Sequence, residues 1–267
     1  MRLFWAFFVR DFQTETSYRI AFLLSFTGVF VTSFLYFFIS QLFGNNINQL
    51  LAEYNGDYFA FVIIGVAFGG YFGVGLNGFA QALRQAQTTG TLEAMMMTPT
   101  SVSGIILGSA LWSYAFTTFR VFIYLLLGTL FLGLQLNSAN YLGALVCLII
   151  SIITFASVGI IAASVIMVIK RGDPITGLFN AFAILVGGVY YPVHVLPDWL
   201  QIISRFLPIT YSLHAVRLAL LSGATWSELM PDLIILLGFS IVLFPLSLLT
   251  FRYAVERARK DGSLAHY

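Results

Sequence analysis

Long runs of apolar residues follow one another along the chain, and nearly all the charged residues lie in the short segments between them. A helix needs about 20 predominantly apolar residues to cross the hydrocarbon core of a bilayer. Runs near that length predict about six transmembrane helices. They cover residues 20–43, 58–79, 104–134, 142–169, 176–191 and 233–251. The sequence therefore predicts an all-α polytopic membrane protein, folded as a single transmembrane domain over residues 1–267.

The second run differs from the others in its glycine content. Small residues let helices approach one another closely within a membrane, so we expect this span to lie inside the bundle. Its glycines are Gly65, Gly69, Gly70, Gly73, Gly75 and Gly78.

Residues 1–19 have the pattern of a helix that lies in the membrane interface. Arg10 and Asp11 interrupt the apolar stretch after a few residues, so we do not expect a cleaved signal peptide. The apolar face consists of phenylalanines at helical spacing, namely Phe4, Phe7, Phe8 and Phe12.

Residues 192–232, between the fifth and sixth runs, are too polar for a plain span and too apolar for an ordinary loop. Pro192, Pro197 and Pro208 divide the segment into short pieces, because proline interrupts helices. Non-helical backbone at membrane depth must be buried in protein or line a wet cavity. We therefore expect a re-entrant helical hairpin here.

Composition and charge placement support a multi-pass protein. Hydrophobic residues make up 59% of the chain and charged residues 9%, against roughly a quarter charged in soluble domains. If the N-terminal side is cytoplasmic, the inner segments hold ten Lys and Arg residues, and the outer ones hold only Arg205 and Arg217. The positive-inside rule then predicts cytoplasmic N- and C-termini, an extracellular hairpin and a cytoplasmic tail over residues 252–267.

Several kinds of chemistry are not expected in this chain. Neither Lys170 nor Lys260 follows a glycine, as the lysine of a P-loop must, so we expect no nucleotide site of that kind. We predict no catalytic residues, no metal site and no cofactor. No carboxylate falls within the predicted spans, which argues against a proton- or sodium-driven carrier.

Arg120 is the one charged residue inside a predicted span. A charge at that depth is costly and requires a partner. In a functional role, Arg120 would contact an anionic or polar substrate, or a group across a subunit interface. In a structural role, it would bind backbone carbonyls and hydroxyls and so hold the bundle together. The functional and the structural interpretation both remain open from the sequence.

Residues 82–99, between the second and third spans, face the cytoplasm on the same charge count. They predict a short helix that carries Arg84 and Glu93 and stops at Pro99. Such a helix can dock a soluble partner, and the alternative is an ordinary amphipathic loop.

Two stretches resemble the membrane subunit of ABC exporters of the ABC-2 class, which serve drug, lipo-oligosaccharide and polysaccharide export. One is GTLEAMMMTP, residues 90–99, which is similar to the cytoplasmic coupling segment of that family. The other is GGVYYPVHVLPDWLQIISRFLPITYSLHAVR, residues 187–217, with its run of small residues and its ordered prolines. The resemblance covers nearly the whole chain.

The resemblance implies an assembly and a set of functional residues. This chain would pair with a second copy of itself or with a related permease, in the lipids of a bacterial plasma (inner) membrane. Two ATPase subunits that bind ATP and Mg²⁺ would dock beneath the pair. No nucleic acid is expected as a partner. Coupling to the ATPase would involve Arg84, Thr91, Leu92, Glu93, Lys170 and Arg171. The translocation path or gate would involve Arg120, Phe68, Phe72, Asn180, Phe182, Tyr190 and Tyr191. For the phenylalanines, lipid contact or packing is the alternative.

We therefore expect a permease subunit that exports an amphipathic or lipid-like substrate by alternating access, with a long glycan as the competing cargo. The alternatives are a secondary carrier or channel and a non-transporting membrane scaffold.

Overall fold

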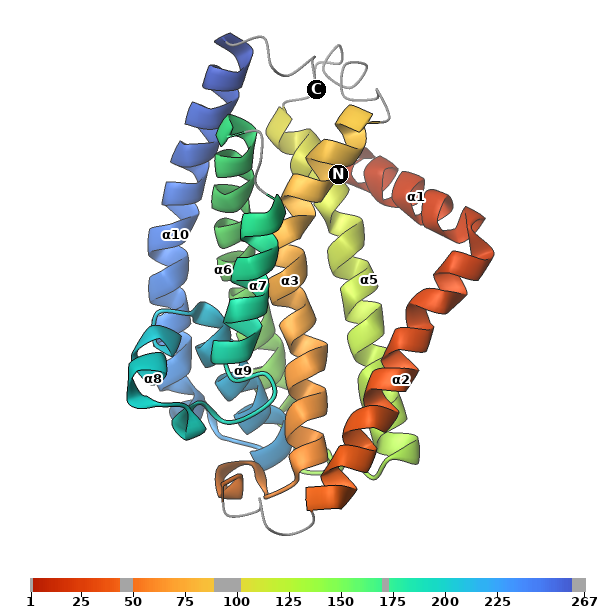
Figure 1. The fold of residues 1–267 in the computed structure, drawn as a ribbon, viewed down its shortest axis with the longest axis vertical. Helices are drawn as coiled ribbons and strands as arrows, with labels where there is room; N and C mark the ends of the chain where they lie inside the picture. Colours follow the sequence, from red (N-terminus) through yellow and green to blue (C-terminus); the bar gives the residue numbers. More distant parts are fainter. Residues whose placement is uncertain (1, 44–49, 89–101, 170–172, 261–267) are drawn as a thin grey trace.

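The computed structural model describes residues 2–43, 50–88, 102–169 and 173–260. Every regular element in these ranges is helical, and the long helices run side by side as a bundle (Figure 1). Five of the described helices are long and apolar enough to cross a membrane: α2, α3, α5, α6 and α10. The prediction of an all-α polytopic membrane protein is confirmed.

Helix α1 (Arg2–Ser17) and helix α2 (Arg19–Phe43) meet at Tyr18. Helix α1 slants away from the bundle, and α2 runs along its edge (Figure 1). The predicted aromatic face of α1 packs on α5 (Val102–Phe131): the rings of Phe8 and Phe12 lie 5.3 Å and 5.4 Å from that of Trp112. Aromatic contacts thus fix the angle at which the N-terminal helix meets the bundle.

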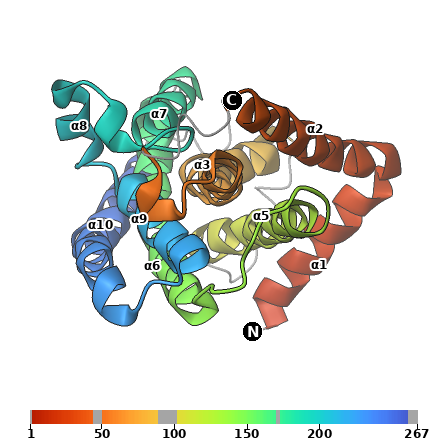
Figure 2. The ribbon, with the colours of Figure 1, turned by 90° about the horizontal axis from the view of Figure 1, so that it is seen from below.

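Helix α3 (Tyr58–Thr88) lies at the centre, surrounded by the other long helices (Figure 2). The Asp57 carboxylate caps its first turn by accepting from the amide of Phe59 at 2.9 Å. In its most apolar stretch 78% of the residues are buried, compared with 11% for α2. The interior position expected from its glycines is therefore confirmed.

Close packing of α3 on α6 (Tyr141–Ile169) explains why one position on each helix requires glycine. A Cβ atom added at Gly159 of α6 would lie 1.7 Å from the carbonyl oxygen of Gly75. A Cβ added at Gly75 would lie 2.7 Å from that of Phe155. The two backbones meet here with no room for a side chain.

Helix α10 (Trp226–Lys260) packs along α6, where the hydroxyls of Thr154 and Ser240 share a 2.6 Å hydrogen bond. It begins before residue 233, where the sixth span was expected. The Glu228 carboxylate caps this start by accepting from the backbone N–H of Thr225 at 2.7 Å and from its hydroxyl at 2.9 Å. It also continues past residue 251 as a polar helix.

Helix α3 likewise continues past the predicted end at Phe79. Residues 82–88, expected in a separate cytoplasmic helix, therefore belong to α3 itself. Residues 89–99 of that segment lie outside the described residues.

Helix α7 (Asp173–Val186) is shorter than the fifth span predicted over residues 176–191. It ends at Val186 because Gly187 follows and Gly188 adopts a left-handed backbone with φ of +82°. Its 14 residues rise about 21 Å, less than the roughly 30 Å of a bilayer core. By length, α7 is not one of the candidate spans.

The predicted hairpin follows α7 as a chain of short helices. They are η3 (Val193–Val195), α8 (Asp198–Ser204), α9 (Pro208–Arg217) and the π-helical turn η4 (Leu218–Ser222). As expected, a proline precedes or begins each of the first three. We call the end of the bundle that holds α9 the hairpin end; it also contains the turn η2 (Ala52–Tyr54) and the start of α10 (Figure 1).

The substitution Gly159→Ala tests the contact between α3 and α6. Because a backbone carbonyl occupies the place of the new methyl group, we expect a loss of about 1–3 kcal/mol in stability. The thermal unfolding midpoint of the purified chain in mild detergent should fall by several degrees. Gly28→Ala on α2 is the matched control, since nothing lies within 4 Å of its added Cβ. Equal midpoints for the two variants would contradict the packing.

Candidate functional site

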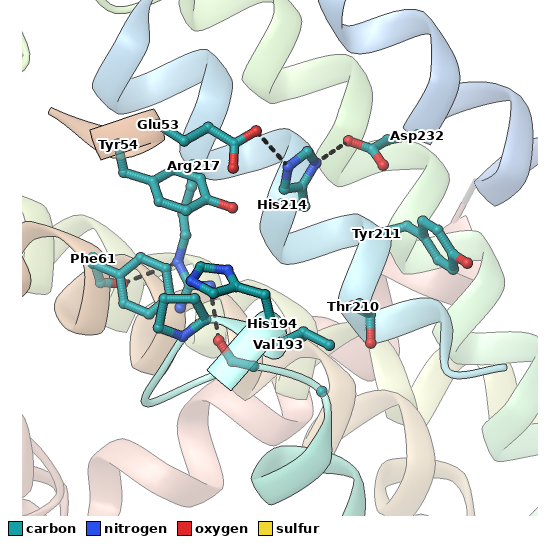
Figure 3. A pocket seen from close by; sticks show the side chains of 13 residues that line it. Glu53, Tyr54, Phe61, Val193, His194, Thr210, Tyr211, His214, Arg217 and Asp232 are labelled. Atoms are coloured by element: carbon teal, nitrogen blue, oxygen red, sulfur yellow. Dashed lines mark hydrogen bonds and ion pairs between the residues drawn. The ribbon is translucent and has the colours of Figure 1, made fainter. Parts of the chain in front are cut away.

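A cavity of about 290 Å³ lies at the hairpin end, between α9, the end of α7 and the turn η2 (Figure 3). Its walls combine ionisable and aromatic side chains. They include Glu53, Tyr54, His194, Tyr211, His214, Arg217 and Asp232. These residues come from four separate parts of the sequence.

The guanidinium of Arg217 forms the base of this cavity and is 3% exposed. It donates to three backbone carbonyls: Nε to Phe61 at 3.0 Å, Nη1 to Gly188 at 2.8 Å and Nη2 to Val189 at 2.8 Å. It also lies over the Phe61 ring, 3.5 Å from the centroid. One side chain of the hairpin thus joins α9 to α3 and to the backbone that ends α7.

The position of Arg217 depends on glycine and on burial. A Cβ at Gly65 would lie 2.1 Å from its Nη2, so α3 must carry glycine there. Burial lowers the pKa of Arg217 to about 9, although the nearby Tyr54 raises it. The group therefore remains charged at neutral pH, and its three carbonyl partners supply the interactions that a buried charge requires.

His214, one turn before Arg217 on α9, lies between two carboxylates (Figure 3). Its Nδ1 is 2.5 Å from Oδ2 of Asp232, near the start of α10, and its Nε2 is 3.1 Å from Oε1 of Glu53, in η2. Burial lowers the pKa of His214, but the hydrogen bond and charge of Asp232, followed by those of Glu53, outweigh it and raise the pKa above 6.5. The surroundings thus favour the doubly protonated ring.

Asp232 corrects the expectation that no span contains a carboxylate. Because α10 begins at Trp226, both Glu228 and Asp232 belong to this candidate span, and Asp232 is buried. The residue lies near the helix start and is paired with His214, so its position differs from that of an unpaired acid at mid-membrane.

A second cavity of about 420 Å³ adjoins the first across the cluster of Glu53, His214 and Asp232. Glu53, His214 and Asp232 line both cavities. The remaining walls of the second cavity include Ser222 and Glu228.

The predicted path residues are distributed between the core and the surface. Phe68 and Phe72 are buried in α3, and the Phe72 ring lies 5.2 Å from that of Phe155 on α6. Phe182 of α7 is 40% exposed. Asn180 faces α3 beside Gly73, and its buried Oδ1 has no hydrogen-bond partner among the described residues. Phe72 and Asn180 therefore both lie where α7 meets α3.

The two predicted gate tyrosines follow α7 but do not line the 290 Å³ cavity. Tyr190 stacks on Tyr36 of α2, with ring centroids 5.9 Å apart. Tyr191 is half-buried.

Arg120 is half-buried at the middle of α5. Its buried Nε has no hydrogen-bond partner in the described part of the chain. One turn further along the same helix, Tyr124 is buried.

The predicted coupling residues fall mostly beyond the described structure. Thr91, Leu92, Glu93, Lys170 and Arg171 lie outside the described residues, and Arg84 lies in α3, where only its backbone is described. Among the described residues, no group of three or more His, Cys, Asp or Glu side chains is placed to hold a metal ion.

Sequence reasoning assigned no role to Arg217 or to the His214 cluster. His214 and Arg217 are three residues apart on a helix, which signals a shared face. Their partners give no local signal, because Glu53 is 161 positions from His214 and the acceptors of Arg217 are backbone carbonyls.

Comparison with known proteins gives two matches. The family model described as "ABC-2 type transporter" matches residues 2–221, which run from α1 to η4. The linearmycin resistance permease protein LnrN of Bacillus subtilis (strain 168) is 24% identical over 177 residues, which cover 66% of this chain and 46% of that protein. The matched region thus spans about half the length of this curated relative.

The substitution Arg217→Lys tests the role of the guanidinium. A single ammonium cannot reproduce three planar N–H contacts, so carbonyls of α3 and of the α7 end lose their donors. We expect a loss of about 3 kcal/mol or more in stability, measured as a thermal midpoint at least about 5 °C lower. The control is Arg205→Lys in the exposed part of the hairpin, which should unfold like the wild type. A wild-type midpoint for Arg217→Lys would refute this role.

Proposed function

Because the chain belongs to the ABC-2 type transporter family, we propose that it is the permease subunit of an ATP-driven exporter for an amphipathic or lipid-like substrate. The family match over residues 2–221, on a bundle of candidate spans that carries the hairpin, is the observation that supports this most directly. The name of LnrN describes a permease that confers resistance to linearmycin, which favours export as the direction of transport here.

The proposed motor is a pair of separate ATPase subunits that bind ATP and Mg²⁺. The segments that carry the proposed coupling residues follow Thr88 and Ile169, the ends of α3 and α6. Both ends lie opposite the hairpin, where α1 and the last turns of α10 also lie (Figure 1). The segments expected on the cytoplasmic side hold ten Lys and Arg residues, which supports a cytoplasmic orientation for this end and for both termini. We propose that Arg84, Thr91, Leu92, Glu93, Lys170 and Arg171 receive the ATPase there.

A second permease subunit completes the proposed transporter, in the plasma membrane of a bacterium. Along α7, Leu178 is 73% exposed and Leu185 51% exposed in the single chain. Such an apolar face fits either a second permease or lipid. We propose that α7 acts as the sixth span despite its length, with α3 and α7 bordering the path and with Asn180 and Phe182 as contacts to the cargo.

We propose that Arg120 meets an acidic or polar group of the cargo or of the partner subunit. Its buried Nε has no hydrogen-bond partner among the described residues, which supports this interpretation over a bond to the backbone. An apolar, aromatic surround favours an amphipathic molecule over a long glycan. Phe68 and Phe72, by contrast, are buried and serve packing. Tyr190 and Tyr191 are proposed to lie at the outer gate, where Tyr190 ties the hairpin to α2.

The exporter reading predicts a stoichiometric ATPase partner. The tagged chain, purified from native membranes in mild detergent, should carry an ATPase subunit that mass spectrometry identifies. Glu93→Arg should remove it, because the reversed charge falls in the proposed docking segment. Glu256→Arg, a charge reversal on an exposed part of α10, should retain it. A folded wild-type chain that brings no ATPase would refute the exporter and favour a carrier or a scaffold.

A second experiment separates the two roles of Arg120. Arg120→Ala should reduce substrate efflux from cells roughly tenfold, the effect of losing about 1.4 kcal/mol of binding. Assembly with the ATPase and the thermal midpoint should remain those of the wild type. Arg120→Lys, which keeps the charge, should recover part of the efflux. Loss of folding or assembly in Arg120→Ala would show that the residue serves the bundle instead.

A further inference from the structure

The cluster of Glu53, His214 and Asp232 holds together three elements that are distant in sequence. His214 is on α9 of the hairpin, Glu53 is in the segment before α3, and Asp232 is near the start of α10. Each ring nitrogen of His214 faces a different carboxylate (Figure 3). The imidazole is therefore the link between the hairpin and both neighbours.

The charge state of the ring decides whether both contacts attract. A doubly protonated imidazole has two N–H donors and a positive charge, and each carboxylate accepts one bond. A neutral imidazole has one donor, so one carboxylate faces a lone pair. The two acids then lie on either side of an uncharged ring, and repulsion replaces attraction at one of them.

Among the described residues, the other cation that lines these cavities is Arg217, and it does not replace the ring when the ring is neutral. The groups that face His214 are Glu53 and Tyr54 from η2, Tyr211 and Arg217 from α9, Glu228 and Asp232 from α10, and His194 from η3. The donors of Arg217 are turned to backbone carbonyls. Helices α3 and α6 also pack on α9, and neither supplies a charged residue or a histidine to the walls of the two cavities.

The same three residues separate two cavities of about 290 Å³ and 420 Å³. The cluster thus forms a shared wall between the cavity beside the end of α7 and the cavity beside Ser222 and Glu228. Separation of His214 from Glu53, whose side chain is 56% exposed, would open the first cavity to the second.

We propose that His214 is a proton-operated clamp, which fastens the hairpin to η2 and α10 when charged and releases it when neutral, so that the two cavities join. That this release opens an exit for cargo rests on the proposed function; the clamp itself is a property of the fold.

The direction of the pH dependence follows from the raised pKa of His214. In an undocked hairpin the ring has its ordinary pKa near 6.5. The docked ring binds its proton more tightly, so the clamp's stabilisation is complete below about pH 6.5 and is lost as the pH rises through the raised value. Acid therefore closes the clamp, and alkali opens it.

Hydrogen exchange of the purified chain in lipid nanodiscs tests the clamp without ATP, cargo or a partner. Amide exchange of residues 208–222 is measured at about pH 6 and about pH 9 and corrected for the intrinsic base dependence. From about pH 6 to about pH 9, we expect the corrected exchange rate to rise by up to about tenfold for each pH unit by which docking raises the pKa of His214. An unchanged corrected rate in the wild type would overturn the clamp.

Three variants assign the effect to the cluster. His214→Gln should abolish the pH difference, whereas His194→Gln, which removes the other histidine of the same cavity, should retain it. If His214→Gln fails to fold, Glu53→Gln on the exposed side should move the midpoint of the change to lower pH. A wild-type pH response in His214→Gln, or an unmoved midpoint in Glu53→Gln, would refute the proposal. Since recovery of the ATPase partner is a separate measurement, the clamp and the exporter can fail independently.

Discussion

The buried guanidinium of Arg217 is the contact on which the hairpin end depends. A charged group with 3% exposure is tolerated in an apolar core only where its donors are satisfied. Here the acceptors are backbone carbonyls of Phe61, Gly188 and Val189, so the charge binds main chain that no side-chain change can remove. The end of α7, the first turns of α3 and the hairpin are consequently held in one arrangement.

The same arrangement explains the composition of its surroundings. Gly65 leaves room for the guanidinium, and Gly188 turns the backbone so that α7 stops. The Phe61 ring covers the guanidinium plane at 3.5 Å. On the outer side, the His214 cluster adds contacts that respond to pH. The hairpin end thus combines one fixed attachment with one attachment that depends on protonation.

The fold was predictable from the sequence as far as hydropathy determines it. Apolar runs located the five long helices, and the glycines of α3 placed it inside the bundle. The end of α7 was not predictable in this way, because the sequence stays apolar to Tyr191 and only the φ of Gly188 ends the helix. The start of α10 did carry a local signal, since Thr225 and Glu228 have the spacing of a capping box.

The candidate site was less predictable than the fold. Arg217 binds carbonyls, which every residue has, so no sequence pattern identifies its partners. The cluster around His214 exists only because folding brings Glu53 and Asp232 to opposite sides of one ring. Arg120 and Asn180 stood out as polar residues in apolar runs, and within the described ranges a buried atom of each has no hydrogen-bond partner.

The contact between Gly159 and the Gly75 carbonyl has a consequence for movement within the bundle. Two backbones that touch without side chains between them cannot slide past one another, because each carbonyl would meet the next residue's Cβ. Helix α10 is joined to α6 by a buried pair of hydroxyls. We therefore expect helices α3, α6 and α10 to move as one unit when other parts of the molecule rearrange.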